Sequence, residues 1–214
     1  MRGFLKVVLW AAIVIAVIYL IGWAFLFQDF TATDNNMAPN IIKGDNILVY
    51  LHSPLDTGTI TICADPRDET KKVVGRIAGQ PGDKISLIRG SFYLNGTQLD
   101  QTAEGDYVIV DDRNTGAPQT VELSERIETM GMIRYRVLWP RQGHVVARLR
   151  NVREQTVPAG SFFLLADNRA FGEDSRTYGP VKINSCIGRP LLIYQPAEST
   201  GDADSSDRWL SIIR

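Results

Sequence analysis

The pattern of apolar and polar residues divides the chain into two unequal parts, and the first is a single long apolar run. Val7 to Phe27 is 21 consecutive residues without a charged side chain. About 20 apolar residues in a helix, at ~1.5 Å per residue, match the ~30 Å hydrocarbon core of a bilayer. A cleavable secretory signal has a shorter apolar part of roughly 7–15 residues, and a buried soluble helix is the other alternative. We therefore expect an uncleaved transmembrane anchor.

Beyond the anchor, the pattern changes to short runs rich in β-branched and aromatic residues, separated by turn signals. Asn95-Gly96, between two alternating runs, is typical of a β-hairpin. These features favour an all-β body of barrel-like antiparallel sheets, with little helix beyond the anchor. The expected strands are 46–51, 59–63, 72–77, 84–88, 91–94, 107–110, 133–138, 161–165 and 188–194.

Three regions follow from this reading: a cytoplasmic tail and anchor over 1–27, a β body over 28–196, and a tail over 197–214. Within the body, residues 100–131 are polar and weakly periodic, which suggests an insertion or small subdomain. The tail begins with a Ser- and Asp-rich stretch that we expect to be disordered. It ends in the apolar residues 208–214, which either the body or the bilayer surface could receive.

Charge predicts the orientation of the chain and excludes one class of partner. Arg2 and Lys6 precede the apolar run, whereas Asp29 and Asp34 follow it. This asymmetry predicts a cytoplasmic N-terminus, a single pass through the cytoplasmic (inner) membrane and an extracytoplasmic body. Residues 28–214 hold 21 basic and 24 acidic side chains, so we expect no nucleic-acid partner.

Basic residues are concentrated in one part of the body. Between Met132 and Arg153 there are six arginines and no acid. They are either the solvated face of strands or a contact with anionic lipid headgroups, which attract basic segments by about 1 kcal/mol per charge. Only their position in the fold can separate these two interpretations. The arginines are 134, 136, 141, 148, 150 and 153.

Cysteine and histidine give little sign of a metal or redox centre. Cys63 and Cys186 could form one disulfide in an oxidising compartment, or remain free buried thiols. His52 and His144 have no Cys or acidic neighbour at a ligand spacing. We expect no metal and no cofactor.

Three segments in a fixed order carry the functional signal. Taken singly, their Pro and Gly residues fix turns, and their Asp and Arg residues could form a buried ion-pair hub. Together, behind one N-terminal anchor, they resemble the motifs of type I signal peptidases over nearly the whole chain. The segments are Asn36-Met37-Ala38-Pro39-Asn40 with Lys43-Gly44-Asp45, then Arg76 to Asp83 with Pro81-Gly82-Asp83, then Ala166-Asp167-Asn168-Arg169 with Asp174-Ser175-Arg176 and Gly179.

The resemblance implies the signal-peptidase fold, with an all-β extracytoplasmic body on the membrane surface. It also implies a groove that receives an extended peptide as an added strand and accepts small side chains. The partners implied are the bilayer and exported or surface-assembled proteins. By position in the motifs, the groove is lined by Phe30, Ala32, Thr33, Asp34, Met37, Ile41, Val73 and Val74.

The sequence departs from the family at the two residues that perform the chemistry. The family uses a serine hydroxyl activated by a lysine whose pKa is lowered by burial. Here the serine position is Asn36 and the lysine position is Gly75. An amide is not a usable nucleophile, and glycine has no side chain to act as base, so no catalytic residue is intact.

Further departures surround the same centre. Asp34 replaces the serine that helps to hold the oxyanion, and a negative charge there would repel it. Ala166 replaces the first glycine of Gly-Asp-Asn-Arg, Gly172 replaces the serine that supports the lysine, and Asn40 replaces a threonine. This pattern indicates a scaffold released from catalysis.

Three hypotheses remain open. The first is a non-cleaving pseudopeptidase that binds extended segments of exported or surface-assembled proteins. The second is an active signal peptidase with an atypical nucleophile or base, for which Thr33, Asp34 and Lys72 are candidates. The third is a structural envelope protein whose groove is empty or filled by residues 197–214.

Overall fold

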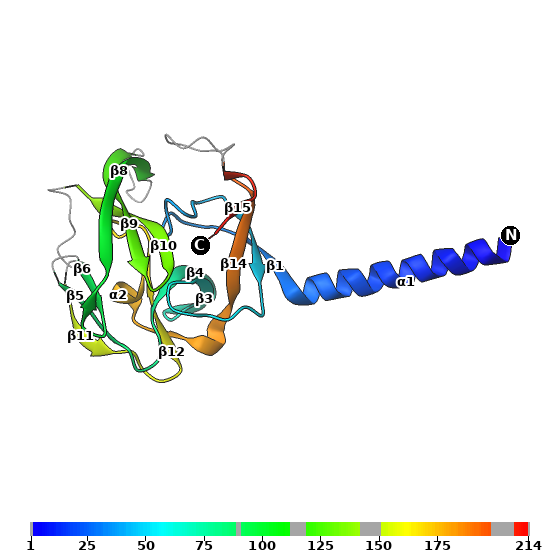
Figure 1. Cartoon of the computed structure of the whole chain (residues 1–214), viewed down its shortest axis with the longest axis horizontal. Coiled ribbons are helices and arrows are strands. Elements are labelled where there is room, and N and C mark those ends of the chain that lie inside the picture. Colours follow the sequence, from blue (N-terminus) through cyan, green and yellow to red (C-terminus); the bar gives the residue numbers. More distant parts are fainter. Residues whose placement is uncertain (1, 89–90, 112–118, 142–150, 198–207, 214) are drawn as a thin grey trace.

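The computed structural model describes residues 2–88, 91–111, 119–141, 151–197 and 208–213. Its first element, α1 (Arg2–Leu26), projects away from the body as a single straight helix (Figure 1). The stretch Lys6–Leu26 has a mean hydropathy of 2.6 and none of it is buried against the body. By length and composition α1 can cross a bilayer, as the apolar run predicts. The chain passes directly from Leu26 into the first strand.

The largest sheet holds eight antiparallel strands in the order β1-β2-β14-β3-β4-β12-β13, with β15 paired to β14. Because β1 continues directly from α1, this sheet connects the anchor to the body. The strands are β1 (Phe27–Thr31), β2 (Asn46–Tyr50), β3 (Ile60–Asp65), β4 (Asp68–Gly79), β12 (Ser161–Leu165), β13 (Val181–Lys182), β14 (Cys186–Gln195) and β15 (Ser211–Ile212).

Two smaller antiparallel sheets complete the body, in the orders β10-β9-β8 and β11-β5-β6-β7. The expected all-β body is confirmed. Within the described ranges, however, the sheets are open and none closes into a barrel. Helix beyond α1 is limited, in those ranges, to the short α2 (Ser175–Tyr178) and η2 (Ile183–Ser185). The strands are β5 (Lys84–Ile88), β6 (Ser91–Leu94), β7 (Thr97–Gln98), β8 (Asp100–Asp111), β9 (Gln119–Met130), β10 (Ile133–Pro140) and β11 (Val152–Thr156).

Every strand expected from the sequence overlaps an observed one, but the polar region 100–131 is more regular than its sequence indicates. It forms β8 and β9, each 12 residues long, paired along their length. Few of their side chains reach the core, among them Ile109, Leu123 and Met130, so the alternation of apolar and polar residues is weak. Whether the region is an inserted subdomain stays a prediction.

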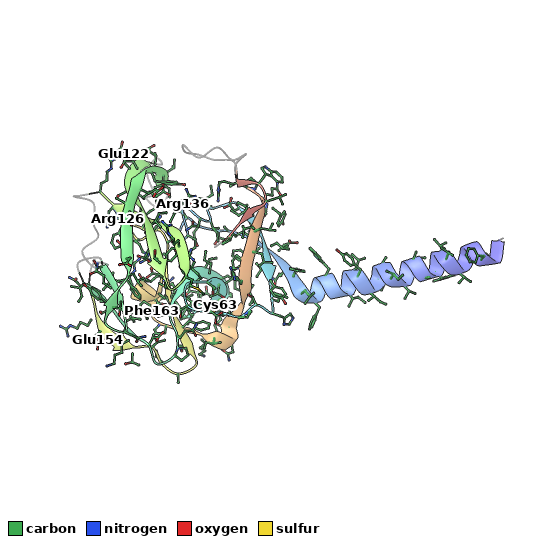
Figure 2. The ribbon with its side chains drawn as sticks, in the orientation of Figure 1. Cys63, Glu122, Arg126, Arg136, Glu154 and Phe163 are labelled. Carbon is green, nitrogen blue, oxygen red and sulfur yellow. A yellow bond between two sulfur atoms is a disulfide. The ribbon has the colours of Figure 1, made fainter. Side chains whose placement is uncertain are left out.

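The two cysteines form a disulfide between neighbouring strands. Cys63 of β3 lies opposite Cys186 of β14, with an S–S distance of 2.09 Å. The bond resolves the alternative that the sequence leaves open and joins positions 123 residues apart. Figure 2 labels Cys63 near the centre of the large sheet.

The C-terminal residues dock onto the body. β15 pairs with β14, and Ile213 is 5% exposed within an apolar cluster that includes Ile47, Ile193 and Ala32. Arg208 forms an ion pair with the fully buried Asp45. The body therefore receives one face of this segment. The expected disorder of the Ser- and Asp-rich stretch falls on residues 198–207, which lie outside the described residues.

Candidate functional site

The first and third motif segments are joined by hydrogen bonds around Asn36. The main-chain N–H of Asn168 donates to the carbonyl oxygen of Asn36 at 2.9 Å, and the Asn168 side chain donates to the carbonyl of Asn35 at 3.1 Å. The main-chain N–H of Glu173 donates to the side-chain oxygen of Asn36 at 3.1 Å. Asn36 thus links two loops, which is a structural use of the position where the family places its nucleophile.

The main-chain amide of Asn36 contacts an acidic side chain. Its main-chain N–H donates to Asp34 Oδ1 at 2.9 Å. Burial raises the pKa of Asp34, and the nearby charge of Glu173 acts in the same direction, while hydrogen bonds from Asn36 and Thr33 oppose the shift. A half-buried carboxylate here disfavours a developing oxyanion rather than stabilising it.

Gly75 lies in the interior of β4, opposite Thr61 of β3, at a point where a side chain has no room. A Cβ atom on Gly75 would lie 2.9 Å from Leu164 Cβ and 3.2 Å from Leu164 Cδ1. Leu164 is fully buried on β12. The lysine of the family is therefore replaced by two features together: a glycine, and a leucine that packs against it.

Gly172 shows the same kind of replacement. A Cβ atom there would collide with Ala166 Cβ and would lie 2.6 Å from the carbonyl oxygen of Asn168. Ala166 is the residue that replaces a family glycine, so its methyl group lies beside the position of the lost serine. The departures at 166 and 172 are therefore spatially paired.

The retained residues of the third segment form a buried ion-pair hub. Arg76 donates to both carboxylate oxygens of Asp167, at 2.8 and 2.6 Å, and both side chains are fully buried. Asn40 donates to the same carboxylate at 2.6 Å, and the Arg76 guanidinium lies 3.7 Å from the centre of the Tyr135 ring. The side-chain amide of Asn40, which stands where the family has a threonine, thus joins the first segment to this ion-pair hub.

A second buried ion pair fixes the loop that follows β12. Arg169 pairs with the buried Glu128 of β9, which also accepts from the Tyr135 hydroxyl. Burial raises the pKa of Tyr135, and the charge of Glu128 adds to this.

The start of α2 is fixed by three motif residues. Asp174 caps α2 and accepts from the N–H of Ala166 at 2.8 Å, and Arg176 pairs with Asp174. The Ser175 hydroxyl accepts from the N–H of Leu164 at 2.9 Å. These contacts hold the start of α2 against β12 and the residue that follows it.

The remaining motif residues shape turns. Gly82 has φ +89°, in the left-handed region that favours glycine. Asp83 accepts from the N–H of Gln80 at 2.8 Å and from the Asn95 side chain at 2.9 Å. Pro39 is buried beside the Asn36 turn.

The expected groove residues divide between two apolar clusters. Ala32, Met37, Ile41 and Val74 are buried in one cluster, against which Phe30 packs, and Val73 is buried in another. Thr33 is exposed and Asp34 is half-buried, so these two remain open to a ligand. The structure brings the first-segment residues and Val74 together, while Val73 faces the side of the sheet that bears the disulfide.

An open strand edge lies beside these residues. β4 pairs with β3 along its length, but β12 covers its other edge only from Arg76 to Gly79. In the part of the chain that is described, no strand pairs with this edge at residues 71–74. An unpaired edge of this kind can accept an added strand.

Neither nearby lysine has the buried surroundings that a lysine base needs. Lys71 and Lys72 are exposed, and Lys71 pairs with Asp68 at 3.4 Å. A lysine acts as a base when apolar surroundings disfavour its charge, and neither residue has them. Leu164 and Glu173 lie outside the sequence motifs, and no pattern in the sequence separates Leu164 from an ordinary core residue of a strand.

Comparisons with known proteins agree with the motifs. The family model "Signal peptidase, peptidase S26" matches residues 4–195. Signal peptidase I of Streptococcus pneumoniae R6 is 26% identical over 181 residues, covering 83% of this chain and 86% of the relative. Signal peptidase IB of Staphylococcus aureus Mu50 is 23% identical over 198 residues, covering 86% of each.

A solved signal peptidase I from Enterococcus faecalis V583 is 23% identical, with a TM-score of 0.36, covering 65% of this chain and 97% of the other. The matched residues 4–195 include α1 and all three motif segments. The apolar helix and the relatives together indicate a single-pass membrane anchor. The chain belongs to the signal peptidase family, peptidase S26.

Proposed function

We propose that this chain is a non-cleaving member of its family, which binds extended segments of exported or surface-assembled proteins at the membrane. The observation that carries the proposal is the Gly75–Leu164 contact, because the volume beside the lost base is filled by a buried side chain. Asn36 adds to it, since its side chain is engaged by the N–H of Glu173. Membership of the family implies exported proteins as ligands.

Peptide binding is supported by the open edge of β4. A peptide added at residues 71–74 would use main-chain hydrogen bonds for affinity, and its alternate side chains would point toward either face. On the segment before Asn36, Thr33 is exposed and Asp34 is half-buried. The groove in this proposal follows the one expected from the sequence: residues from Phe30 to Ile41 form one wall and Val74 the other, while Val73 faces the opposite side of β4.

The proposed topology places the N-terminus in the cytoplasm and the body outside the cytoplasmic membrane. The flanking charges support it, with Arg2 and Lys6 before the anchor and Asp29 and Asp34 after it. The Cys63–Cys186 disulfide supports it independently, because such bonds persist in oxidising compartments.

The test measures binding and cleavage in one sample. Full-length protein in detergent is mixed with a fluorescent peptide from the cleavage region of a preprotein, and anisotropy and product formation are followed together. Thr33→Trp is designed to obstruct the groove from an exposed position, and Thr97→Trp, on exposed β7, is the matched control. We expect binding without product, weakened at least tenfold, about 1.4 kcal/mol, by Thr33→Trp alone. Equal binding by both variants would contradict the groove.

One observation favours an active enzyme as the second candidate. The Thr33 hydroxyl hydrogen-bonds to Asp34, whose pKa is raised by burial, so a hydroxyl and a carboxylate base are adjacent. This candidate predicts product formation by the natural chain, abolished by Thr33→Val and by Asp34→Asn. The same assay therefore separates the two candidates.

A further inference from the structure

A cleft of about 450 Å³ lies between β10 and the C-terminal segment. Of the motif residues described above, only Pro39 and Asn40 line it. Arg134 and Arg136 line it from β10, and Arg208 lines it from the opposite side. Figure 2 shows Arg136 on the side of the β8–β10 sheet that faces the C-terminal segment. Three guanidinium groups around one opening indicate an anionic ligand.

The charges around the cleft leave a positive excess. Arg208 is paired with Asp45, and Arg136 lies 3.2 Å from Glu125. Arg134 is exposed on β10, opposite Thr129, and no acidic partner is found for it among the described residues. In the same row Asp100 is two strands away, about 10 Å at the usual strand spacing. Arg134 is therefore available to an incoming anion.

Large apolar side chains are exposed beside this cleft. Trp209, Leu210 and Ile212 are 58%, 68% and 75% exposed, respectively. They cannot fold inward, because the ion pair of Arg208 and the burial of Ile213 fix the other face of the segment. A Trp with apolar neighbours and basic residues is the composition found at the headgroup level of a bilayer.

The position of the segment brings it close to the anchor. Ile212 lies opposite Leu192, Leu192 opposite Leu48, and Leu48 opposite Asp29. Three strand spacings place Ile212 about 14 Å from Asp29, which is only three residues beyond the end of α1. In Figure 1, β14 and β15 lie on the side of the body from which α1 leaves, and β5 lies on the far side.

We propose that the cleft between β10 and the C-terminal segment binds the headgroup of an anionic phospholipid, with Trp209, Leu210 and Ile212 inserted beside it at the level of the upper acyl chains. Arg134 and Arg136 contact the phosphate from β10, and Arg208 borders it while holding the segment to the body. The family match ends at residue 195, so the segment that forms one wall lies outside the matched residues. This inference does not depend on peptide binding.

The first experiment measures lipid selectivity with full-length protein in detergent. Native mass spectrometry follows titration with short-chain phosphatidylglycerol, phosphatidylcholine and water-soluble glycerol phosphate. We expect preference for phosphatidylglycerol, reduced about fivefold by Arg134→Gln, about fivefold by Arg136→Gln, and not at all by the control Arg153→Gln on exposed β11. Equal binding of both lipids would overturn the proposal. Glycerol phosphate binding as tightly as the lipid, or an acidic peptide displacing the lipid, would also overturn it.

The second experiment measures depth in the bilayer. Ile212→Cys and Ile88→Cys are labelled with an environment-sensitive fluorophore in full-length protein reconstituted in phosphatidylglycerol-containing nanodiscs. Ile88 is a matched control, because it is 52% exposed on β5, on the far side of the body. We expect quenching by lipid-borne quenchers at position 212 and not at position 88. Equal quenching at both positions, or none at 212, would refute insertion of the segment.

Discussion

The contact between Gly75 and Leu164 predicts that the two positions are energetically coupled. Gly75→Ala adds a methyl group that would lie 2.9 Å from Leu164 Cβ and 3.2 Å from Leu164 Cδ1. Real Cβ atoms essentially never lie closer than 3.0 Å to such a neighbour, and a rotamer change of Leu164 does not move its Cβ, so β4 and β12 must move apart. Such overpacking costs about 1–3 kcal/mol of stability.

The magnitude of the coupling follows from which contacts remain. Leu164→Ala alone costs about 2–5 kcal/mol, because it leaves a cavity beneath β12. In that background Gly75→Ala no longer meets Leu164 Cδ1, although the Cβ contact persists. We therefore expect the double variant to be more stable than the sum of the single effects, by about 0.5–1.5 kcal/mol.

The assay is equilibrium unfolding in denaturant of the four full-length proteins in detergent, followed by tryptophan fluorescence. Gly79→Ala with Leu164→Ala serves as the control cycle, since Gly79 also lies on β4 but faces Val157 and Ile85. Additivity of the Gly75 cycle within about 0.5 kcal/mol would refute the reasoning. The same geometry predicts that Asn36→Ser with Gly75→Lys does not restore cleavage unless Leu164 is also truncated.

Three further predictions concern stability. Replacing both Cys63 and Cys186 by alanine should lower the unfolding free energy by up to about 5 kcal/mol relative to the oxidised natural protein, because the loop-closure entropy of the 123-residue span is lost. The reduced natural protein should lose about the same amount. Arg208→Gln should lower the unfolding free energy by about 3–5 kcal/mol, because it leaves the carboxylate of Asp45 buried without its cation. Arg208→Lys should recover part of this loss. An unchanged unfolding free energy in denaturant titration would contradict the ion pair. The raised pKa of Asp34 means that the folded protein binds the Asp34 proton more tightly than the unfolded chain does. The contribution of this proton to stability is therefore complete below the unfolded pKa of 3.8 and is lost as pH rises through the folded pKa. Asp34→Asn should therefore stabilise the protein at pH 7 but not at pH 3 in thermal unfolding.

The sequence predicted the strands of the body and displays the substitutions at Asn36 and Gly75, because both depend on local patterns. That the site does not cleave stays a prediction. Alternating apolar runs mark strands wherever one face is buried, and the motif positions of Asn36 and Gly75 need only an ordered match. The length of β8 and β9 was not predicted, because few of their side chains reach the core.

The residues that fill the site could be identified only from the structure. In the sequence, Leu164 is an ordinary core residue. The structure shows that a Cβ atom on Gly75 would lie 2.9 Å from Leu164 Cβ. The pairing of Ala166 with Gly172 likewise depends on a turn that brings positions six residues apart into contact. The docking of Arg208 onto Asp45 spans most of the chain, and no short-range pattern indicates it.

The disulfide has a consequence for how the protein tolerates cleavage by other proteases. Cys63 lies on the N-terminal side of the second and third motif segments, and Cys186 lies after both. A single cut anywhere between them leaves two polypeptides that remain covalently joined and attached to the membrane through α1. Such a nicked molecule migrates as one species on a non-reducing gel and as two after reduction. Its C-terminal fragment, which always holds Cys186 and Arg208, would enter solution only when the disulfide and the sheet are both opened.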